Sequence, residues 1–492
     1  MSAPKTAGID CDFIEYKELF IGGRWVTPAG SDVIEVVNPH NGEPVGRVPH
    51  ASRADVDAAV AAARDAFDHG AWPRLPLEER LSVLMRLSEG LKARVPEMAR
   101  LITRQNGSPI RWSLAAQAAA PAAMYAVAAQ IARSFPFEER RDGLKNPVLI
   151  RREPVGVVAA VVPWNVPEFV TSLKLGPALA AGCAVVLKPS PETPLDANLL
   201  AEVAEEAGLP AGVLSVLPAG REVSEYLVSH PGVDKVSFTG SVAAGKRVME
   251  VAAGNLTRVT LELGGKSAAL ILPDADLDAA VAAITAASWT LNSGQACIAL
   301  TRVLAPRTRY EEVAERLTAA VSALVVGDPL DPATQVGPMV TRRQQERNLD
   351  YLRIGLEEGA TLLAGGGVPD GLDGGCYVRP TLFGDVDNSM RIEREEIFGP
   401  VVCLLPYETE DDAVRIANDS DFGLSGAVFT ADQDHGIDIA RRIRTGTITV
   451  NGFATEPTAP FGGYKHSGIG REMGADGLAS FLESKTIALP GR

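Results

Sequence analysis

The chain has 492 residues, of which 46% are hydrophobic and 22% charged, and its formal net charge is −15. A chain of this length exceeds the size at which one hydrophobic core stops growing, so we expect a globular protein with two or more domains. The acidic excess argues against nucleic acid or an anionic membrane as the main partner and favours a small molecule.

The N-terminal segment and the most apolar run give no sign of export or membrane insertion. Residues 1–20 lack a basic region followed by an apolar one, so we expect no secretory signal. Residues 115–132 are mostly alanine and are interrupted by Gln117, Pro121 and Gln130, which predicts a buried helix rather than a membrane span.

The cysteines are few and show neither paired nor metal-ligand spacing. They are Cys11, Cys183, Cys297, Cys376 and Cys403. A sparse, odd set of this kind is typical of a reducing compartment, so we expect a cytoplasmic protein without a metal site.

Apolar strands alternate with amphipathic helices, which predicts an α/β protein. Residues 54–67 place Val56, Val60, Ala63 and Phe67 on one face of a helix. Five apolar segments are then expected as strands: 155–165, 181–190, 212–217, 234–240 and 258–265. Strands separated by helices form parallel sheets, which bind ligands beyond the carboxyl ends of their strands.

The segment between the second and third strands carries helix signals. Thr193 is expected to cap a helix and Pro194 to occupy its first position. Gly208 and Pro210 are expected to end it.

Polar or turn-forming residues stand where the expected strands end. They are Trp164, Asn165, Lys188, Gly240, Ser241, Glu262 and Gly264. The GxGxxG fingerprint of dinucleotide-binding sheets is absent after the first strand. The nearest substitute is the turn between Gly240 and Gly245, whose N–H groups could face a phosphate. By itself this turn is a weak signal, because such turns are common in α/β proteins.

Eight short motifs follow one another along the chain. They are PWN (163–165), LKPS (187–190), FTGS (238–241), LELGGKS (261–267), GQACIAL (294–300), EEIFGP (395–400), NGF (451–453) and FGGYKHSGIGRE (461–472). Together they resemble the NAD(P)-dependent aldehyde dehydrogenase superfamily from residue 20 to the C-terminus. LELGGKS followed by GQxC makes the resemblance highly specific.

The resemblance implies an α/β fold with a Rossmann-type parallel-sheet cofactor domain, an α/β catalytic domain and a small β oligomerisation extension. The expected bounds are 1–134 and 155–262 for the cofactor domain, 263–472 for the catalytic domain, and 135–154 with 473–492 for the extension. In the family the extension crosses to a neighbouring subunit, so we expect a homodimer or a homotetramer.

Three residues match the family's catalytic positions. Cys297 is the expected nucleophile, because a thiolate that attacks an aldehyde gives a thiohemiacetal able to expel hydride. Glu262 matches the general base that activates water against the resulting thioester. Asn165 matches the amide that holds the oxyanion together with the backbone N–H of Cys297.

Each of these residues also has a structural alternative. Without the resemblance, Cys297 is interpreted as a buried small hydrophobe, as we expect for Cys183 and Cys403. Glu262 is then a strand-end carboxylate paired with Lys266. Asn165 is then an ordinary turn residue.

The cofactor contacts rest on the same resemblance. The matching residues are Trp164, Lys188, Gly240, Ser241, Leu263, Glu396 and Phe398. Lys188 is expected at the adenosine ribose, Glu396 at the nicotinamide ribose and Phe398 against the nicotinamide ring. Pro191 stands where many NAD-preferring members carry a glutamate, and Glu192 follows it. Since no arginine is evident nearby to hold a 2′-phosphate, we expect NAD, with NADP as the alternative.

Apolar residues are expected to line the substrate tunnel. They are Val166, Val170, Ile298, Phe453 and Phe461, beside the loop 453–460. None is an arginine that would clamp a substrate carboxylate, although Glu168 and Glu456 are also candidates for the wall. We expect an aliphatic, terpenoid or aromatic aldehyde rather than succinic semialdehyde.

Two other functions stay open from the sequence. A CoA-acylating semialdehyde dehydrogenase would share Cys297 but pass the acyl group to a thiol, and the presence of Glu262 speaks against it. A non-catalytic protein that retains the fold is the second alternative. The joint presence of five residues speaks against it: Cys297, Glu262, Asn165, Lys188 and Glu396.

Overall fold

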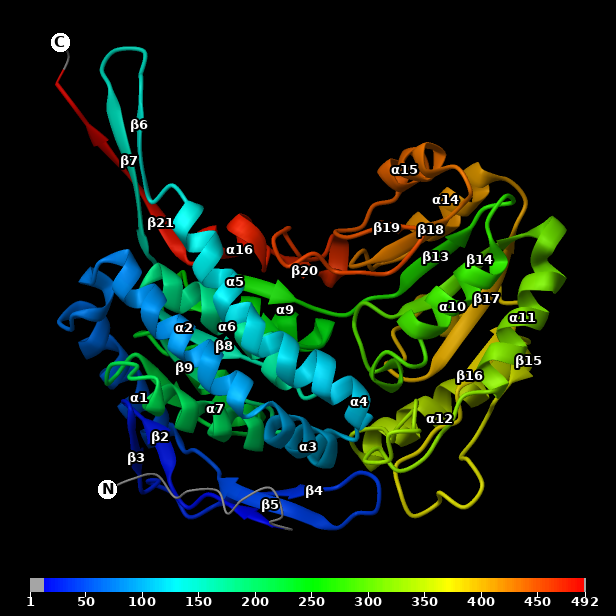
Figure 1. Ribbon diagram of the computed structural model, residues 1–492, viewed down its shortest axis with the longest axis horizontal. Helices are drawn as coiled ribbons and strands as arrows, with labels where there is room; N and C mark the ends of the chain where they lie inside the picture. Colours follow the sequence, from blue (N-terminus) through cyan, green and yellow to red (C-terminus); the bar gives the residue numbers. More distant parts are fainter. Residues whose placement is uncertain (1–12, 491–492) are drawn as a thin grey trace.

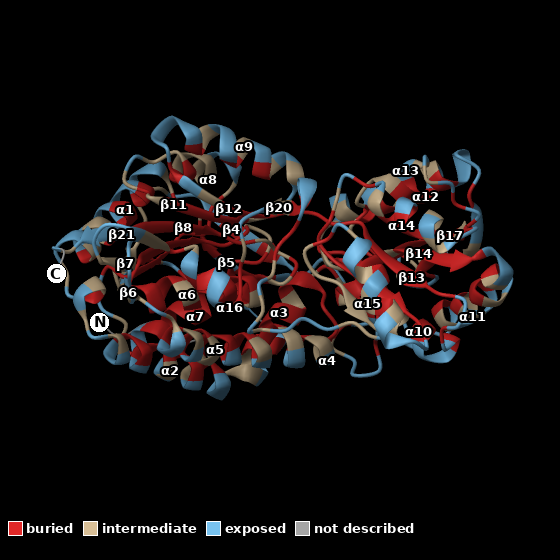
Figure 2. Cartoon of the chain, turned by 90° about the horizontal axis from the view of Figure 1, so that it is seen from above, coloured by how far each residue is buried: buried red, intermediate tan, exposed pale blue. Residues whose placement is uncertain are grey.

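The chain forms two lobes, each with a central sheet between helices, and a thin β-arm projects from the first lobe (Figure 1). This computed structural model describes residues 13–490, so Cys11 lies outside the described residues. Buried residues follow the two sheets, while exposed residues cover the outer helices (Figure 2).

The first lobe is built on an eight-stranded sheet. In spatial order its strands are β20 (Gly468–Ile469), β12 (Arg258–Glu262), β11 (Lys235–Thr239), β8 (Val157–Val161), β9 (Ala184–Lys188), β10 (Leu214–Val216), β2 (Leu19–Ile21) and β3 (Arg24–Val26). The five predicted strands run parallel, from β12 to β10. Because the chain proceeds to opposite sides of β8, the carboxyl end of this strand is a topological switch point.

Helices cover both faces of the first sheet. They are α1 (Arg53–Asp68), η1 (Trp72–Arg74), α2 (Leu77–Ala93), α3 (Val95–Asn106), α4 (Ile110–Trp112), the π-helix η2 (Ser113–Ala119), α5 (Ala120–Ser134), α6 (Pro167–Ala181), α7 (Leu195–Glu206), α8 (Arg221–Val228), α9 (Val242–Ala252) and η3 (Ala253–Asn255). A small sheet of β1 (Ile14–Glu15), β5 (Pro44–Pro49) and β4 (Val33–Val37) adjoins them. The predicted helix at 54–67 is confirmed as α1.

The predicted start of α7 is wrong by one residue. Pro194 is the N-cap residue, and its own side chain makes no capping hydrogen bond. The N–H of Leu195 instead donates to Gln105 Oε1 at 3.1 Å, so the helix is capped from α3 rather than by Thr193.

The second lobe contains a seven-stranded sheet. Its spatial order is β15 (Thr361–Ala364), β16 (Thr381–Gly384), β17 (Val401–Tyr407), β14 (Leu300–Pro306), β13 (Ser267–Ile271), β18 (Gly426–Phe429) and β19 (Thr449–Val450). Its helices are α10 (Leu277–Ala287), η4 (Asn292–Gly294), η5 (Arg307–Arg309), α11 (Tyr310–Ser322), α12 (Arg342–Glu357), α13 (Arg391–Arg394), α14 (Glu410–Asn418) and α15 (Gln433–Arg442). After η6 (Lys465–Ser467), β20 returns the chain to the first sheet.

The arm is an antiparallel sheet of β6 (Glu138–Arg141), β7 (Val148–Pro154) and β21 (Leu482–Ala488). The short helix α16 (Gly474–Ala479) leads into it. Segments far apart in sequence are therefore joined in one projecting sheet (Figure 1). Its role in oligomerisation, like the domain bounds and the cytoplasmic location, stays a prediction.

Among residues 13–490, one helical run, Ile110–Ser134, is long and apolar enough to cross a membrane by length and composition. Its last part, α5, packs against α2 and α6 and buries Ala122, Tyr125 and Ala129. This packing is that of a core helix, as the sequence predicted.

Candidate active site

The amide of Asn165 is fixed at the switch point after β8. Its Nδ2 donates to the carbonyl of Gln295 at 2.9 Å, two residues before Cys297. Its own carbonyl accepts hydrogen bonds from Asn106 Nδ2 at 3.2 Å and from Asn292 Nδ2 at 2.9 Å. Three contacts from two lobes hold this residue, so the alternative of an ordinary turn residue does not describe it.

Gly264 and Gly265 follow β12 and pass close to two groups of the second lobe. A Cβ on Gly264 would lie 2.3 Å from Glu396 Oε2, and one on Gly265 would lie 2.2 Å from the carbonyl oxygen of Cys297. The N–H of Gly265 donates to Glu396 Oε1 at 2.9 Å. Any side chain here would push the second-lobe loops away, so this crossing requires glycine.

Glu262 ends β12 with a buried carboxyl group that has no hydrogen-bond partner within residues 13–490. The ammonium of Lys266 is also buried and has no hydrogen-bond partner in the described part of the chain, so the alternative of an ion pair between Glu262 and Lys266 is wrong. Burial, reinforced by the carboxylate of Glu472, raises the pKa of Glu262 well above its ordinary value, while Lys174 and Arg471 oppose the rise. Such a carboxyl group is suited to accept a proton near neutral pH.

Cys297 is partly exposed, whereas the other cysteines of the described chain, Cys183 and Cys403 among them, are buried. The interpretation as a buried hydrophobe therefore fits those two residues and not Cys297. Burial of the sulfur raises the pKa of Cys297 to about 12, and the charges of Glu396 and Glu262 act in the same direction. The resting group is a neutral thiol that needs a base to become a nucleophile.

A buried ion pair lies beside Glu262. Lys174 Nζ, on α6, donates to Glu472 Oε1 at 2.5 Å and to Ser237 Oγ at 3.3 Å. The side chains of Lys174 and Glu472 are 0% and 3% exposed. The sequence analysis assigned a role to neither. The available signal was a single lysine in the otherwise apolar second half of the α6 sequence.

Five of the expected cofactor residues end or follow strands of the first sheet, whereas Glu396 and Phe398 come from the second lobe. Trp164 faces Phe398 of the second lobe edge-on, with ring centroids 5.3 Å apart at 86°. Burial lowers the pKa of Lys188 to about 8, and the charge of Glu192 opposes this. Arg343 Nη2 lies 3.8 Å from Glu192 Oε1, so the expectation of no nearby arginine is wrong.

The turn after β11 leads into the N-terminus of α9, and several of its N–H groups donate within the protein. Gly240 donates its N–H to the carbonyl of Glu262 at 3.0 Å. Ser241 caps α9 by accepting the N–H of Ala244 at 3.3 Å. Gly245 lets α9 approach Leu263, because a Cβ would lie 2.5 Å from its Cδ2 atom. Leu263 therefore packs against the first turns of α9. The N-terminus of this helix favours an anion, because the helix dipole is positive at that end.

The loop carrying Glu396 and Phe398 is held by the first turns of α12. Gln344 Nε2 donates to the carbonyl of Phe398 at 2.8 Å, and Arg347 Nη2 donates to that of Glu396 at 2.6 Å. Phe398 adopts a left-handed backbone with φ 66°, which is strained for an aromatic residue. Burial raises the pKa of Glu396 to about 7, against the hydrogen bond from the Gly265 N–H.

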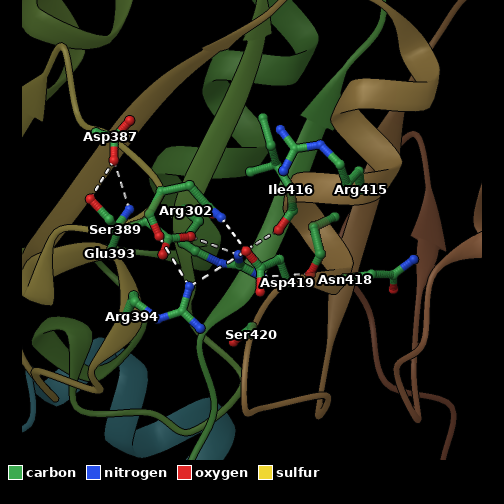
Figure 3. A network of polar contacts seen from close by, with 12 residues as sticks. Arg302, Asp387, Ser389, Glu393, Arg394, Arg415, Ile416, Asn418, Asp419 and Ser420 are labelled. Carbon is green, nitrogen blue, oxygen red and sulfur yellow. Dashed lines mark hydrogen bonds and ion pairs between the residues drawn. The ribbon is translucent and has the colours of Figure 1, made fainter.

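A buried arginine anchors the same region from beneath. Arg302 pairs with Glu393 at 2.8 Å and donates to the carbonyl of Lys266 at 2.8 Å. It also donates to the carbonyls of Ile416 at 3.1 Å and Ala417 at 2.9 Å, at the end of α14 (Figure 3). One side chain thus ties the glycine crossing to α13, the helix that precedes Glu396.

The expected substrate residues lie in different apolar groups. Val170 is buried in the core of the first lobe with Val166 packed beside it, and Ile298 is half-buried next to the cysteine. Phe453 packs on the core of the second lobe. Phe461 packs on a separate cluster of Met124, Leu173 and Met473.

An apolar pocket adjoins the Phe461 cluster. Its lining includes Met124, Val127, Ile131, Leu173, Pro457 and Met473, and no charged side chain. Glu168 is buried and accepts from Tyr125 at 3.4 Å, while Glu456 is exposed and accepts from Thr458 at 2.6 Å. Neither glutamate lines this pocket.

Fold and site together define an oxidoreductase that acts on aldehydes. The chain belongs to the aldehyde dehydrogenase family, whose model matches residues 25–487. It is 46% identical over 479 residues to geranial dehydrogenase of Castellaniella defragrans. The aligned region covers 97% of this chain and 100% of that relative. The expected family, fold and enzyme class are confirmed.

Two solved structures share the whole architecture. An aldehyde dehydrogenase of Mycobacterium tuberculosis in complex with NAD+ has a TM-score of 0.95 and 50% identity, over 97% of this chain and 98% of that one. A mutant of aldehyde dehydrogenase C from Pseudomonas syringae, in complex with NAD+ and octanal, has a TM-score of 0.94 and 41% identity. This match covers 99% of the present chain and 98% of that one.

The raised pKa of Cys297 predicts how its thiol reacts with iodoacetamide. Because the pKa is about 12, the thiolate fraction and the labelling rate should rise about tenfold per pH unit from about pH 7 to about pH 10. Mass spectrometry of the native protein should locate this pH-dependent label at Cys297, and the label at this position is lost in Cys297→Ser. A rate that levels off near about pH 8.5 would show an ordinary thiol.

Removal of the buried cation at Lys174 should destabilise the protein and shift its pH profile. In Lys174→Met the Glu472 carboxylate is left buried and unpaired, so denaturant titration should show a loss of about 3 kcal/mol. The pKa of Glu262 should rise further, and the acidic limb of the pH–rate profile should move to higher pH. Lys235→Met is the matched control, since this buried lysine donates to Thr260 Oγ1 at 2.6 Å. Equal shifts of the acidic limb in both variants would contradict the prediction.

Proposed function

We propose that the enzyme oxidises an apolar aldehyde to its carboxylic acid with NAD+ through a covalent adduct on Cys297. Three observations support this proposal. The amide of Asn165 is bound to the carbonyl of Gln295, two residues before the partly exposed residue Cys297. The carboxyl group of Glu262 has no hydrogen-bond partner within residues 13–490, and its charge acts on the Cys297 thiol.

The first step forms the adduct. Glu262, with its raised pKa, accepts the thiol proton, and the sulfur of Cys297 attacks the aldehyde carbon. Charge then develops on the aldehyde oxygen. The amide of Asn165 has two N–H groups, of which one is held by Gln295, so the other joins the backbone N–H of Cys297 as a donor to this oxyanion.

The second step releases the acid. Collapse of the oxyanion expels a hydride, which NAD+ accepts when bound. Glu262 first releases the thiol proton to solvent. It then takes a proton from water as the water oxygen attacks the thioester, and the carbon–sulfur bond breaks with Cys297 leaving as the thiolate. Glu472 supports both steps because its charge keeps the pKa of Glu262 high.

The residues present fit a dinucleotide. Lys188 offers a buried ammonium at the end of β9, and Ser241 begins α9, whose free N–H groups suit a pyrophosphate. Glu396 and Phe398 border the glycine crossing, where Gly264 leaves no side chain in the way. NAD+ in two similar solved structures supports this cofactor, and NADP is the alternative.

The apolar pocket supports the substrate class. Octanal in one solved structure and the name geranial dehydrogenase of a relative agree with a chain-like apolar aldehyde. A carboxylate would be buried against Met124, Leu173 and Met473 without a cationic partner in the pocket lining.

NADH formation should therefore discriminate strongly between aldehydes. We expect kcat/KM with octanal or geranial to exceed that with succinic semialdehyde by about 100-fold, without added CoA. Initial rates followed by NADH absorbance test this. Turnover that requires CoA would instead support the acylating alternative, and equal rates with all aldehydes would overturn the assignment to apolar aldehydes.

The two steps should separate in variants. Glu262→Gln should keep a rapid burst of NADH at high pH, where the thiol deprotonates unaided, but lower steady-state turnover at least about 100-fold. Asn165→Ala should slow the burst itself by about 100-fold. Rapid-mixing absorbance measures both phases. Wild-type turnover in Glu262→Gln, or a wild-type burst in Asn165→Ala, would contradict these roles.

A further inference from the structure

An acidic residue and an arginine meet where β9 ends, and the proposed mechanism uses neither. In dinucleotide-binding sheets an acidic residue after the second strand binds the ribose 2′-hydroxyl of NAD, whereas a nearby arginine accommodates the 2′-phosphate of NADP. β9 is the second strand of the parallel set that begins with β8. Glu192 follows it by four residues, so the general rule places Glu192 at the ribose.

Pro191 shapes the turn that presents Glu192. The N–H of Thr193 donates to the carbonyl of Ser190 at 3.1 Å, which closes a four-residue turn with proline in its second position. Glu192 occupies the third position, and its carboxylate accepts a hydrogen bond from Ser190 Oγ. Position 191 therefore carries no carboxylate, but the proline turn holds the carboxylate of Glu192 in place one residue later. The negative charge of the Glu192 carboxylate also acts on the buried ammonium of Lys188, where it opposes the lowering of the lysine pKa by burial.

Arg343 reaches the same carboxylate from the second lobe. It is the second residue of α12, and its Nη2 lies 3.8 Å from Glu192 Oε1. The arginine side chain is 87% exposed, whereas that of Glu192 is 22% exposed. The exposed Arg343 side chain is therefore only weakly held by Glu192. Its guanidinium can turn towards another anion at the carboxyl edge of the first sheet.

We propose that Glu192 and Arg343 together select the cofactor at the ribose 2′ position, an inference that rests on the proposed use of NAD+. Glu192 accepts the 2′-hydroxyl of NAD+ and repels a 2′-phosphate. Arg343 offsets that repulsion by pairing with the phosphate of NADP+. The two residues give a preference for NAD+ without excluding NADP+, and they replace the function that proline cannot perform at position 191.

The test is the affinity of the free enzyme for each cofactor by isothermal titration calorimetry, with 2′-AMP and 5′-AMP as fragment probes. Glu192→Gln should tighten NADP+ and 2′-AMP about fivefold relative to NAD+ and 5′-AMP. Arg343→Gln should weaken them about fivefold on the same scale. Arg342→Gln is the matched control, because this neighbour on α12 donates to Gln345 Oε1 at 2.6 Å and not to Glu192.

The outcomes separate this inference from the proposed function. The measured quantity is the ratio of the affinity for NADP+ to that for NAD+. Opposite changes of this ratio in Glu192→Gln and Arg343→Gln, with no change in Arg342→Gln, support the proposal that Glu192 and Arg343 select the cofactor. If NAD+ binds but the ratio is the same in all variants, or if Arg342→Gln matches Arg343→Gln, this proposal is wrong and the proposed function stands. If neither NAD+ nor NADP+ binds the wild-type enzyme, the proposed cofactor itself is wrong.

Discussion

The close approach of backbone at Gly264 and Gly265 is the constraint on which the rest of the site depends. The segment between β12 and β13 is four residues long, and it joins the two sheets. Glu262 stands at its start, and the glycines lie under Cys297 and the Glu396 carboxylate. Because this linker has no side chains at its centre, groups from both lobes can meet at one point.

Charge is buried around this crossing in two distinct ways. Lys174 is paired with Glu472, and Arg302 with Glu393, so these ions fix the position of neighbouring segments. The carboxyl group of Glu262, in contrast, is buried and has no hydrogen-bond partner among the residues that the structure describes. An unpaired buried carboxyl group costs stability, and such groups are concentrated where chemistry uses them. The lack of a partner therefore distinguishes Glu262 from the supporting ion pairs Lys174–Glu472 and Arg302–Glu393.

The sequence predicted the parts of the fold that depend on local pattern. Continuous apolar runs located β8, β9 and the other parallel strands, because a strand covered on both faces has no polar positions. The start of α7 was missed since its cap comes from Gln105, ninety residues away in sequence. Arg343 was missed for the same reason, as its neighbour Glu192 lies in the other lobe. Residues that act across the interface carry no local signal.

The pKa values of the site imply an order of events. The Cys297 thiol lies near two carboxyl groups that share its burial, and the pKa of Glu396 is itself raised to about 7. Each of these groups disfavours the ionisation of the others, so the resting site holds its protons. A bound NAD+ would add a positive charge to this site, which favours ionisation of the Cys297 thiol. Cofactor binding would then promote formation of the nucleophile, whose proton passes to Glu262, and the sulfur would stay in its less oxidisable form before a hydride acceptor is present.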